Sequence, residues 1–230
     1  MTNTWLDKNQ LPPFKRLNIQ FDPIKLKDEL DDLMRLRGFD AYDKEYKELF
    51  HGNSSTDPER AQNKNMTSIK DQFNTLPLTV FDDDFDLSKR VEMSNSIWDR
   101  RVAKNNTKLD ERFYRKPVEG IPEHTASVMR AFEPFVHRTR YTRLCAGQRI
   151  DEHVDYDTKY SVRLMMAIDT NDQCTNSWRM PDGSIETCHL PADGSIWFIN
   201  QGLPHWAIND GTTDRIHLIL SVDSQSVLEI

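Results

Sequence analysis

The sequence predicts a mainly β protein in which antiparallel strands form a double-sheet barrel, with helices in the N-terminal part as support. From Thr139 onward the chain consists of short β-rich runs, such as YSVRLMMAI, SIWFIN and DRIHLILSV, at the spacing typical of a sandwich or small barrel. Turn residues separate these runs. Pro181-Asp182-Gly183 is a strong hairpin signal, and Ala192-Asp193-Gly194 is a second turn directly before residues 195–199.

The residues ahead of this region predict its supporting elements. Residues 17–21, LNIQF, alternate between apolar and polar as a short strand does. Asp22-Pro23 then supplies a cap and a first-turn proline for a helix that ends at Gly38. Pro122 begins a second helix, which Pro134 ends or kinks. The positions expected on the buried faces of the two helices are Leu26, Leu30, Leu33, Met34, Val128, Met129 and Phe132.

Three other stretches are less regular. Residues 51–68 are rich in Asn, Ser, Thr, Asp, Pro and Gln, which predicts a mobile loop. Residues 76–81, LPLTVF, are a candidate strand. The acidic run over residues 82–86 is interpreted as a solvated turn and not as a set of metal ligands, because runs of like charge usually remain hydrated.

Composition excludes several classes of protein. A formal charge of -7 lacks the electrostatic footprint of a nucleic-acid binder. The N-terminal residues contain no apolar run that resembles a signal peptide, and no segment approaches the length of a membrane span, so we expect a soluble, cytoplasmic protein without a membrane partner. Three cysteines without CxxC spacing predict reduced thiols. At 230 residues the chain is long enough for one large domain with a real core.

His153 and Asp155 are the first candidate metal ligands. On a strand, side chains two residues apart point to the same face. The pair alone is weak evidence, because a chain of this composition contains about one His-x-Asp by chance. His205 adds a third ligand from a remote strand, since it follows an apolar run and the turn NQGLP. Two histidines and one carboxylate form the facial triad that binds non-haem iron and leaves coordination positions open.

Arg215 is a candidate for anion binding near this triad. It lies ten residues after His205, and alternation along DRIHLILSV places Arg215 and His217 on one face. An arginine that points into a barrel needs an anion, and its planar fork suits a carboxylate, here the distal carboxylate of 2-oxoglutarate. Arg163 is a second candidate for a carboxylate of the cosubstrate or the substrate, unless it lies on the outside of the barrel.

These motifs together resemble a known family. The pattern HVD, then LPHWAIN, then DRIHLIL, with Ala167-Ile168-Asp169-Thr170-Asn171 and the run SIWFINQGLPH, is similar to the Fe(II)/2-oxoglutarate-dependent aspartyl/asparaginyl β-hydroxylase superfamily. Within that superfamily, the likeness is greatest to bacterial free-proline cis-hydroxylases. The resemblance covers residues from about Arg138 to Asp223, with a fainter likeness over residues 17–36.

The resemblance implies the double-stranded β-helix fold, also called a jelly roll and shared with cupins. It implies a dioxygenase that uses Fe(II), 2-oxoglutarate and O₂ to hydroxylate an unactivated C–H bond of an amino acid, with release of succinate and CO₂. A single oxygenase domain would span residues 1–230, with 1–137 as an αβ support and substrate-capping region and 138–223 as the jelly-roll core with the metal site. The implied residues are His153, Asp155 and His205 for iron, and Arg215, Arg163 and His217 for the cosubstrate.

Several alternatives remain open at this point. A free, proline-like amino acid requires a closed pocket for its carboxylate and amine, with Arg143 or Arg163 as the candidate for the carboxylate. The alternative substrate is an Asp, Asn or Pro residue in a peptide or protein, which requires an open groove. A cupin-like metal-dependent isomerase or a non-catalytic barrel is the alternative from another class. Such barrels have no need for an inward arginine at position 215, so Arg215 favours the oxygenase.

Overall fold

A computed structural model describes residues 5–37, 73–86 and 110–229. The elements in order are η1 (Lys8–Gln10), β1 (Phe14–Gln20), α1 (Pro23–Arg37), β2 (Phe73–Pro77), β3 (Thr79–Val80), η4 (Glu111–Phe113), β4 (Lys116–Pro117), α6 (Glu123–Arg130), β5 (Val136–Leu144), β6 (Gln148–His153), β7 (Val162–Asp169), β8 (Cys174–Arg179), β9 (Ile185–Cys188), β10 (Ser195–Ile199), β11 (His205–Asn209), β12 (Arg215–Val222) and η5 (Gln225–Glu229). Within these ranges, no helix combines the length and the apolar composition needed to cross a membrane.

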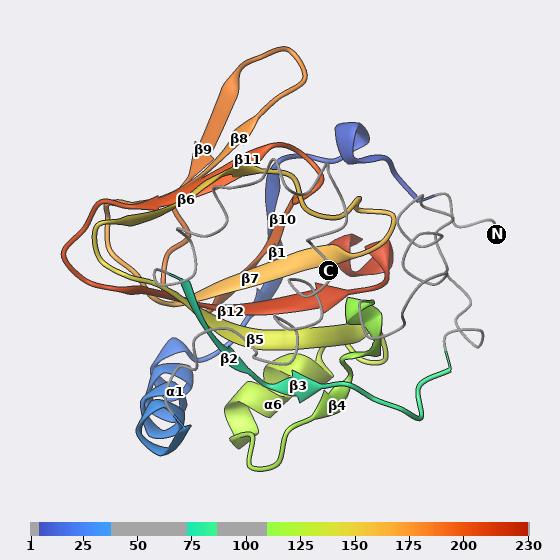
Figure 1. Cartoon of the computed structure of the whole chain (residues 1–230), viewed down its shortest axis with the longest axis vertical. Coiled ribbons are helices and arrows are strands. Elements are labelled where there is room, and N and C mark those ends of the chain that lie inside the picture. The colour runs from blue at the N-terminus through green and yellow to red at the C-terminus, as the bar shows by residue number, and fades with distance from the viewer. Residues whose placement is uncertain (1–4, 38–72, 87–109, 230) are drawn as a thin grey trace, which may run out of the picture.

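Two antiparallel sheets face each other across the barrel (Figure 1). The larger sheet has the strand order β1-β10-β7-β12-β5-β2, and the smaller sheet has the order β6-β11-β8-β9. Along the chain from β5 to β12, strands of the larger sheet alternate with strands of the smaller one, except that β8 and β9 form a hairpin within the smaller sheet. This winding of an antiparallel chain between two sheets is the double-stranded β-helix, so the predicted fold class is confirmed.

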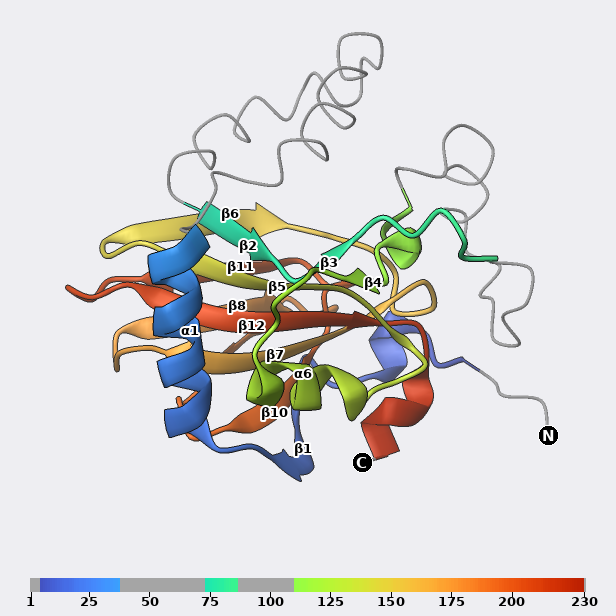
Figure 2. The ribbon, with the colours of Figure 1, turned by 90° about the horizontal axis from the view of Figure 1, so that it is seen from below.

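The helices α1 and α6 lie against one face of the larger sheet, as Figures 1 and 2 show. Asp22 caps α1, because its Oδ1 accepts hydrogen bonds from the backbone amides of Ile24 and Lys25. α6 begins after Pro122, which has no side-chain acceptor to offer. The carboxylate of Glu29 on α1 accepts from the first backbone amides of α6 instead, so one helix caps the other.

The main hydrophobic core fills the space between these helices and the sheet. The predicted helix positions Leu26, Leu30, Leu33, Val128, Met129 and Phe132 are all buried there, with Met34 packed against them. The sheet contributes alternate residues, such as Leu164 and Met166 from β7 and Leu218 and Leu220 from β12. Because successive side chains of a strand alternate, the residues between them face the smaller sheet and form the interior of the barrel. Arg163, Met165 and Ala167 are therefore interior residues.

Tight turns at glycine explain two of the strand connections. Gly183 and Gly194 have φ angles of 86° and 82°, which L side chains rarely adopt. A Cβ on Gly194 would also lie 1.9 Å from the backbone oxygen of Phe21, so only glycine fits beside β1. Both turns occur where the sequence predicted them, ahead of β9 and β10.

The stretch 76–81 differs from its prediction as one strand. β2 ends at Pro77 and β3 begins at Thr79, because β2 pairs with β5 in the larger sheet whereas β3 pairs with β4. The acidic residues 82–86 form a half-exposed to exposed turn and belong to no group of metal ligands found among the described residues. The predicted loop at 51–68 lies outside the described residues. Cys145, Cys174 and Cys188 are free thiols, as expected.

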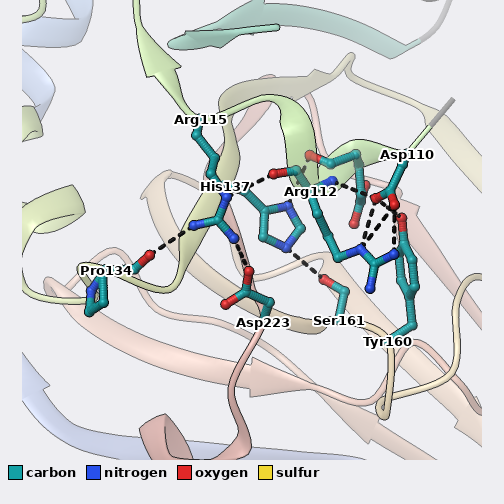
Figure 3. Close-up of polar contacts among 9 residues, drawn as sticks. Asp110, Arg112, Arg115, Pro134, His137, Tyr160, Ser161 and Asp223 are labelled. Carbon is teal, nitrogen blue, oxygen red and sulfur yellow. Dashed lines mark hydrogen bonds and ion pairs between the residues drawn. The ribbon is translucent and has the colours of Figure 1, made fainter. Parts of the chain in front are cut away.

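A buried polar cluster ties the segment around η4 to the barrel (Figure 3). Asp110 accepts two hydrogen bonds from Nε and Nη2 of Arg112, and both side chains are 1% exposed. The hydroxyl of Tyr160 donates to the same carboxylate at 2.6 Å. Arg115 forms an ion pair with Asp223, just beyond β12. The cluster thus fixes the residues that lead into β7, directly after the candidate ligands.

Asp110→Asn should therefore destabilise the protein markedly. Breaking a buried ion pair by removing one charge costs about 3–5 kcal/mol. The measurement is the free energy of unfolding from urea denaturation. Glu123→Gln, which weakens an exposed pair with Arg130, is the control and should change the midpoint little. Equal effects of the two substitutions would contradict the structural role of Asp110.

Candidate metal centre

The pairing of β6 with β11 brings the two candidate histidines together. His153 is the last residue of β6, His205 is the first residue of β11, and the two are direct partners across the antiparallel ladder. Their ring centroids are 4.3 Å apart. His205 directly follows the turn at residues 200–204, and the register of β11 fixes its position relative to His153.

Each histidine is oriented by the same backbone contact. Nδ1 of His153 donates to the carbonyl oxygen of Asp151 at 2.8 Å, and Nδ1 of His205 donates to that of Leu203 at 2.9 Å. In both cases the acceptor lies two residues earlier in the chain. When Nδ1–H donates, Nε2 is the unprotonated nitrogen and is free to bind a metal. A metal-binding imidazole is usually oriented in this way, by a hydrogen bond from its other ring nitrogen.

Asp155 lies beyond the end of β6, so strand geometry alone does not place it. Its backbone amide donates to the carbonyl oxygen of Gln201 at 3.0 Å, which ties it to the turn ahead of His205. Its Oδ1 lies 3.7 Å from Nε2 of His153. Its Oδ2 accepts a hydrogen bond of 2.8 Å from Nη1 of Arg163. Asp155 is therefore held from both its backbone and its carboxylate.

The three side chains form a compact donor set. One ligand atom from each of His153, Asp155 and His205 lies within 4.8 Å of the other two. Among residues 5–37, 73–86 and 110–229, these three side chains are the group of His, Cys, Asp or Glu residues found close enough together to bind a metal ion. Burial would raise the pKa of Asp155, but Arg163, His153, His205 and Arg140 lower it to about 2. Burial lowers the pKa of His205 to about 4. At neutral pH the set thus offers a carboxylate and a neutral imidazole at these two positions.

Arg215 is the first residue of β12 and lies deep in the barrel. It is 4% exposed, and its Nη1 donates to Oδ1 of Asn176 on the facing sheet at 3.3 Å. Burial lowers its pKa to about 10, so it stays protonated at neutral pH. Burial and the charge of Arg215 hold the pKa of His217 well below its usual value, so that ring is neutral.

Polar atoms on the same interior face lack hydrogen-bond partners among the described residues. Near Arg215 they are Nε of Arg215 itself, Nδ1 of His217 and Oγ1 of Thr142; further along the same face, near Asp155, they are Nε of Arg163 and Oγ of Ser221. Buried polar groups in native proteins normally have partners, so a set of unsatisfied donors on one face indicates a bound polar ligand. Because Arg215 is a buried cation, the three atoms near it fit an anionic ligand.

The remaining predicted arginines take different places. Arg163 faces the interior, is 8% exposed and pairs with Asp155. Arg143 lies opposite Ile216 in the β5–β12 ladder, and Ile216 belongs to the core under the helices. Arg143 therefore faces away from the barrel interior, where Asp214 lies 3.8 Å from it.

Sequence reasoning missed Arg140. It lies opposite Ile219 on the interior face, is 8% exposed, and its charge helps to lower the pKa of Asp155. Alternation separates Arg140 from Arg143 in TRYTRLC. Only the packing of Tyr141 under α6, through its hydroxyl contact with Thr125, shows which of the two faces inward.

An apolar cluster lies beside the candidate ligands. Trp178 is opposite His205 in the β8–β11 ladder, is 1% exposed and packs with Leu203 and Ile199. Phe14 packs beside it in a tilted arrangement, with ring centroids 5.2 Å apart. An apolar wall at this position keeps water away from one side of the site, which strengthens electrostatic interactions inside it.

A double-stranded β-helix with two histidines and a carboxylate at its mouth has the donor set of the non-haem iron oxygenases. The model of the aspartyl/asparaginyl beta-hydroxylase family matches residues 39–225. Because this match covers most of the chain, the protein belongs to that family and is an oxygenase of the hydroxylase type.

Solved structures share parts of the fold. An oxidoreductase of the 2OG-Fe(II) oxygenase family from Burkholderia pseudomallei is 11% identical, with 66% of this chain and 68% of that chain covered and a TM-score of 0.43. A cupin domain from Bordetella pertussis is 16% identical over 40% of this chain and 85% of its own, with a TM-score of 0.30. Peruvianin-I, a cysteine peptidase from Thevetia peruviana latex, is 21% identical over 40% of this chain, with a TM-score of 0.31, and the chain spans 52% of its length. The assignment comes from the family match alone.

The metal-free protein should lose stability as the pH falls from about 6.5 to about 4. Over this range the unfolded state protonates His205, whereas burial keeps the folded ring neutral, so the unfolded state binds more protons. Urea midpoints measured in the presence of a chelator at several pH values test this. His205→Gln should flatten the decline, and a slope equal to that of the wild type would contradict the pKa shift.

Proposed function

We propose that the protein is an Fe(II)- and 2-oxoglutarate-dependent dioxygenase that hydroxylates an unactivated C–H bond of an amino acid with a free carboxylate. The observation that carries the proposal is the shared orientation of His153 and His205, each with Nδ1 on a backbone carbonyl, beside the carboxylate of Asp155 in one compact donor set. In this proposal residues 1–230 form one oxygenase domain, with 138–223 as the jelly-roll core and 1–137 supporting it and capping the substrate.

His153, Asp155 and His205 would hold Fe(II). Two neutral imidazoles and one carboxylate leave the dication with a net positive charge and with open coordination positions. Bound iron with 2-oxoglutarate and O₂ supplies oxidative decarboxylation to succinate and CO₂, coupled to C–H hydroxylation. The apolar wall at Trp178 and Leu203 would keep bulk water from this side of the reaction.

Arg215 would bind the distal carboxylate of the cosubstrate. It is cationic, deeply buried, and has an Nε without a partner among the described residues. A charge-assisted pair with a carboxylate is the interaction that satisfies such a guanidinium. His217, neutral and on the same face, offers a further ring nitrogen to the same ligand.

Arg140 would recognise the carboxylate of the substrate. It lies on the interior face of β5, near enough to Asp155 to influence its pKa, whereas Arg143 lies on the opposite face. A second interior cation close to the ligand set supports a small substrate with a free carboxylate. Hydroxylation of an Asn or Pro residue within a peptide has no need for that cation, whereas the side chain of an Asp residue also carries a carboxylate, so the test below compares free amino acids with blocked peptides.

Anaerobic addition of Fe(II) and 2-oxoglutarate to the purified protein should produce a visible charge-transfer band, because the keto acid chelates the metal. Absorption spectroscopy measures it. His205→Ala should abolish the band, and Arg215→Met should require roughly 30-fold more 2-oxoglutarate, for a loss of about 2 kcal/mol. Absence of the band in the wild type would refute the proposed function.

Arg140→Gln should raise the KM for a free amino acid at least tenfold, since a buried charge-assisted hydrogen bond to its carboxylate is lost. Succinate release, measured across the free amino acids and a few blocked peptides, identifies the substrate first. Arg143→Gln is the matched control and should leave KM near the wild-type value. A preference for blocked peptides, with wild-type KM in Arg140→Gln, would show that the substrate is a residue in a chain.

A further inference from the structure

Arg163 stands close to the candidate ligands and far from Arg215. In the β7–β12 ladder Arg163 lies opposite Ser221, which is six residues along β12 from Arg215. Six residues of a strand span about 20 Å. The backbones of the two arginines are therefore well separated along the barrel, with Arg163 near the candidate ligands and Arg215 at the start of β12.

The partner of Arg163 within the structure is Asp155. Its Nη1 donates to Oδ2 at 2.8 Å, while Oδ1, the other oxygen of the carboxylate, faces Nε2 of His153 at 3.7 Å. One oxygen of the carboxylate is therefore held by Arg163, and the other is directed at His153. This arrangement favours a single metal–oxygen bond from Asp155.

Asp155 needs this contact because of where it lies in the chain. His153 and His205 are fixed by the β6–β11 ladder, but Asp155 is outside any strand. Its backbone amide donates a hydrogen bond to the carbonyl oxygen of Gln201, and its side chain is 28% exposed. Arg163, by contrast, belongs to a strand paired on both sides, with β10 and with β12. A rigid guanidinium fork thus restrains a carboxylate that the backbone leaves free to rotate.

We propose that Arg163 is the positioning residue of the metal centre: it holds Oδ2 of Asp155 so that Oδ1 alone is presented to the metal. This inference rests on the proposed iron site and assigns Arg163 to the ligand set instead of to the cosubstrate. Through this contact, Arg163 keeps open the coordination position that a bidentate Asp155 would occupy.

Electrostatics and positioning predict opposite effects of removing Arg163. A cation beside the site repels a dication, so loss of its charge by itself strengthens metal binding. Loss of a side chain that orients a metal ligand typically weakens metal affinity by about tenfold or more. A weaker affinity after substitution therefore reports lost positioning and not lost charge.

The test is titration of the metal-free protein with Co(II) alone, without 2-oxoglutarate, followed by calorimetry and by visible absorption. Arg163→Met should bind Co(II) about tenfold more weakly and should change the shape of the Co(II) absorption bands, because the coordination of Asp155 changes. Arg143→Met carries the same change of charge on the face of β5 that is turned away from the barrel interior, and it is the matched control, with wild-type affinity and spectrum. Circular dichroism and thermal melting show that each variant is folded.

The outcomes separate this inference from the proposed function. If the wild type and His205→Ala both fail to bind Co(II) tightly, the metal site itself is wrong. If the wild type binds, His205→Ala does not, and Arg163→Met retains or exceeds wild-type affinity with an unchanged spectrum, Arg163 does not position Asp155. If Arg163→Met loses affinity for 2-oxoglutarate but keeps its affinity for Co(II), Arg163 binds the cosubstrate and does not position Asp155.

Discussion

The antiparallel pairing of β6 with β11 is the constraint on which the candidate site depends. It sets His153 directly opposite His205, and the hydrogen bond from the backbone amide of Asp155 to the carbonyl oxygen of Gln201 extends the contact between the two segments beyond the strands. A shift of one residue in this ladder would turn one histidine to the outside of the barrel. The register is therefore both a folding constraint and the basis of the ligand geometry.

Charge in the barrel interior is arranged unevenly. Asp155 pairs with Arg163 and lies near the charge of Arg140, while Arg215 lies at the start of β12 with the neutral His217 and Asn176 beside it. Burial of a guanidinium without a counter-charge is costly, and the cost is offset when an anion binds. The interior is thus built for small anions, which suits a keto-acid cosubstrate and a substrate that carries a carboxylate.

Two supports outside the barrel interior stabilise this arrangement. α1 and α6 cover the far face of the larger sheet, and Glu29 links the two helices by capping α6. On the side of the ligands, Asp110 holds Arg112 and Tyr160, so the residues between His153 and β7 are anchored to the segment at η4 (Figure 3). Buried polar contacts of this kind restrict a loop more than apolar contacts do, because each donor has a required direction.

The sequence by itself determined the fold class and most of the strands, because alternation, turn glycines and helix caps are local signals. It also indicated His153, Asp155, His205 and Arg215 through their residue types and spacing. It did not show that β2 and β3 are separate strands, because that break comes from pairing with different partners.

The sequence also did not show which of Arg140 and Arg143 faces inward. Alternation gives two faces, and only the packing of the helices on one of them decides which is the interior. Likewise, the contact of Arg163 with Asp155 joins a strand to a loop, so tertiary structure alone defines it.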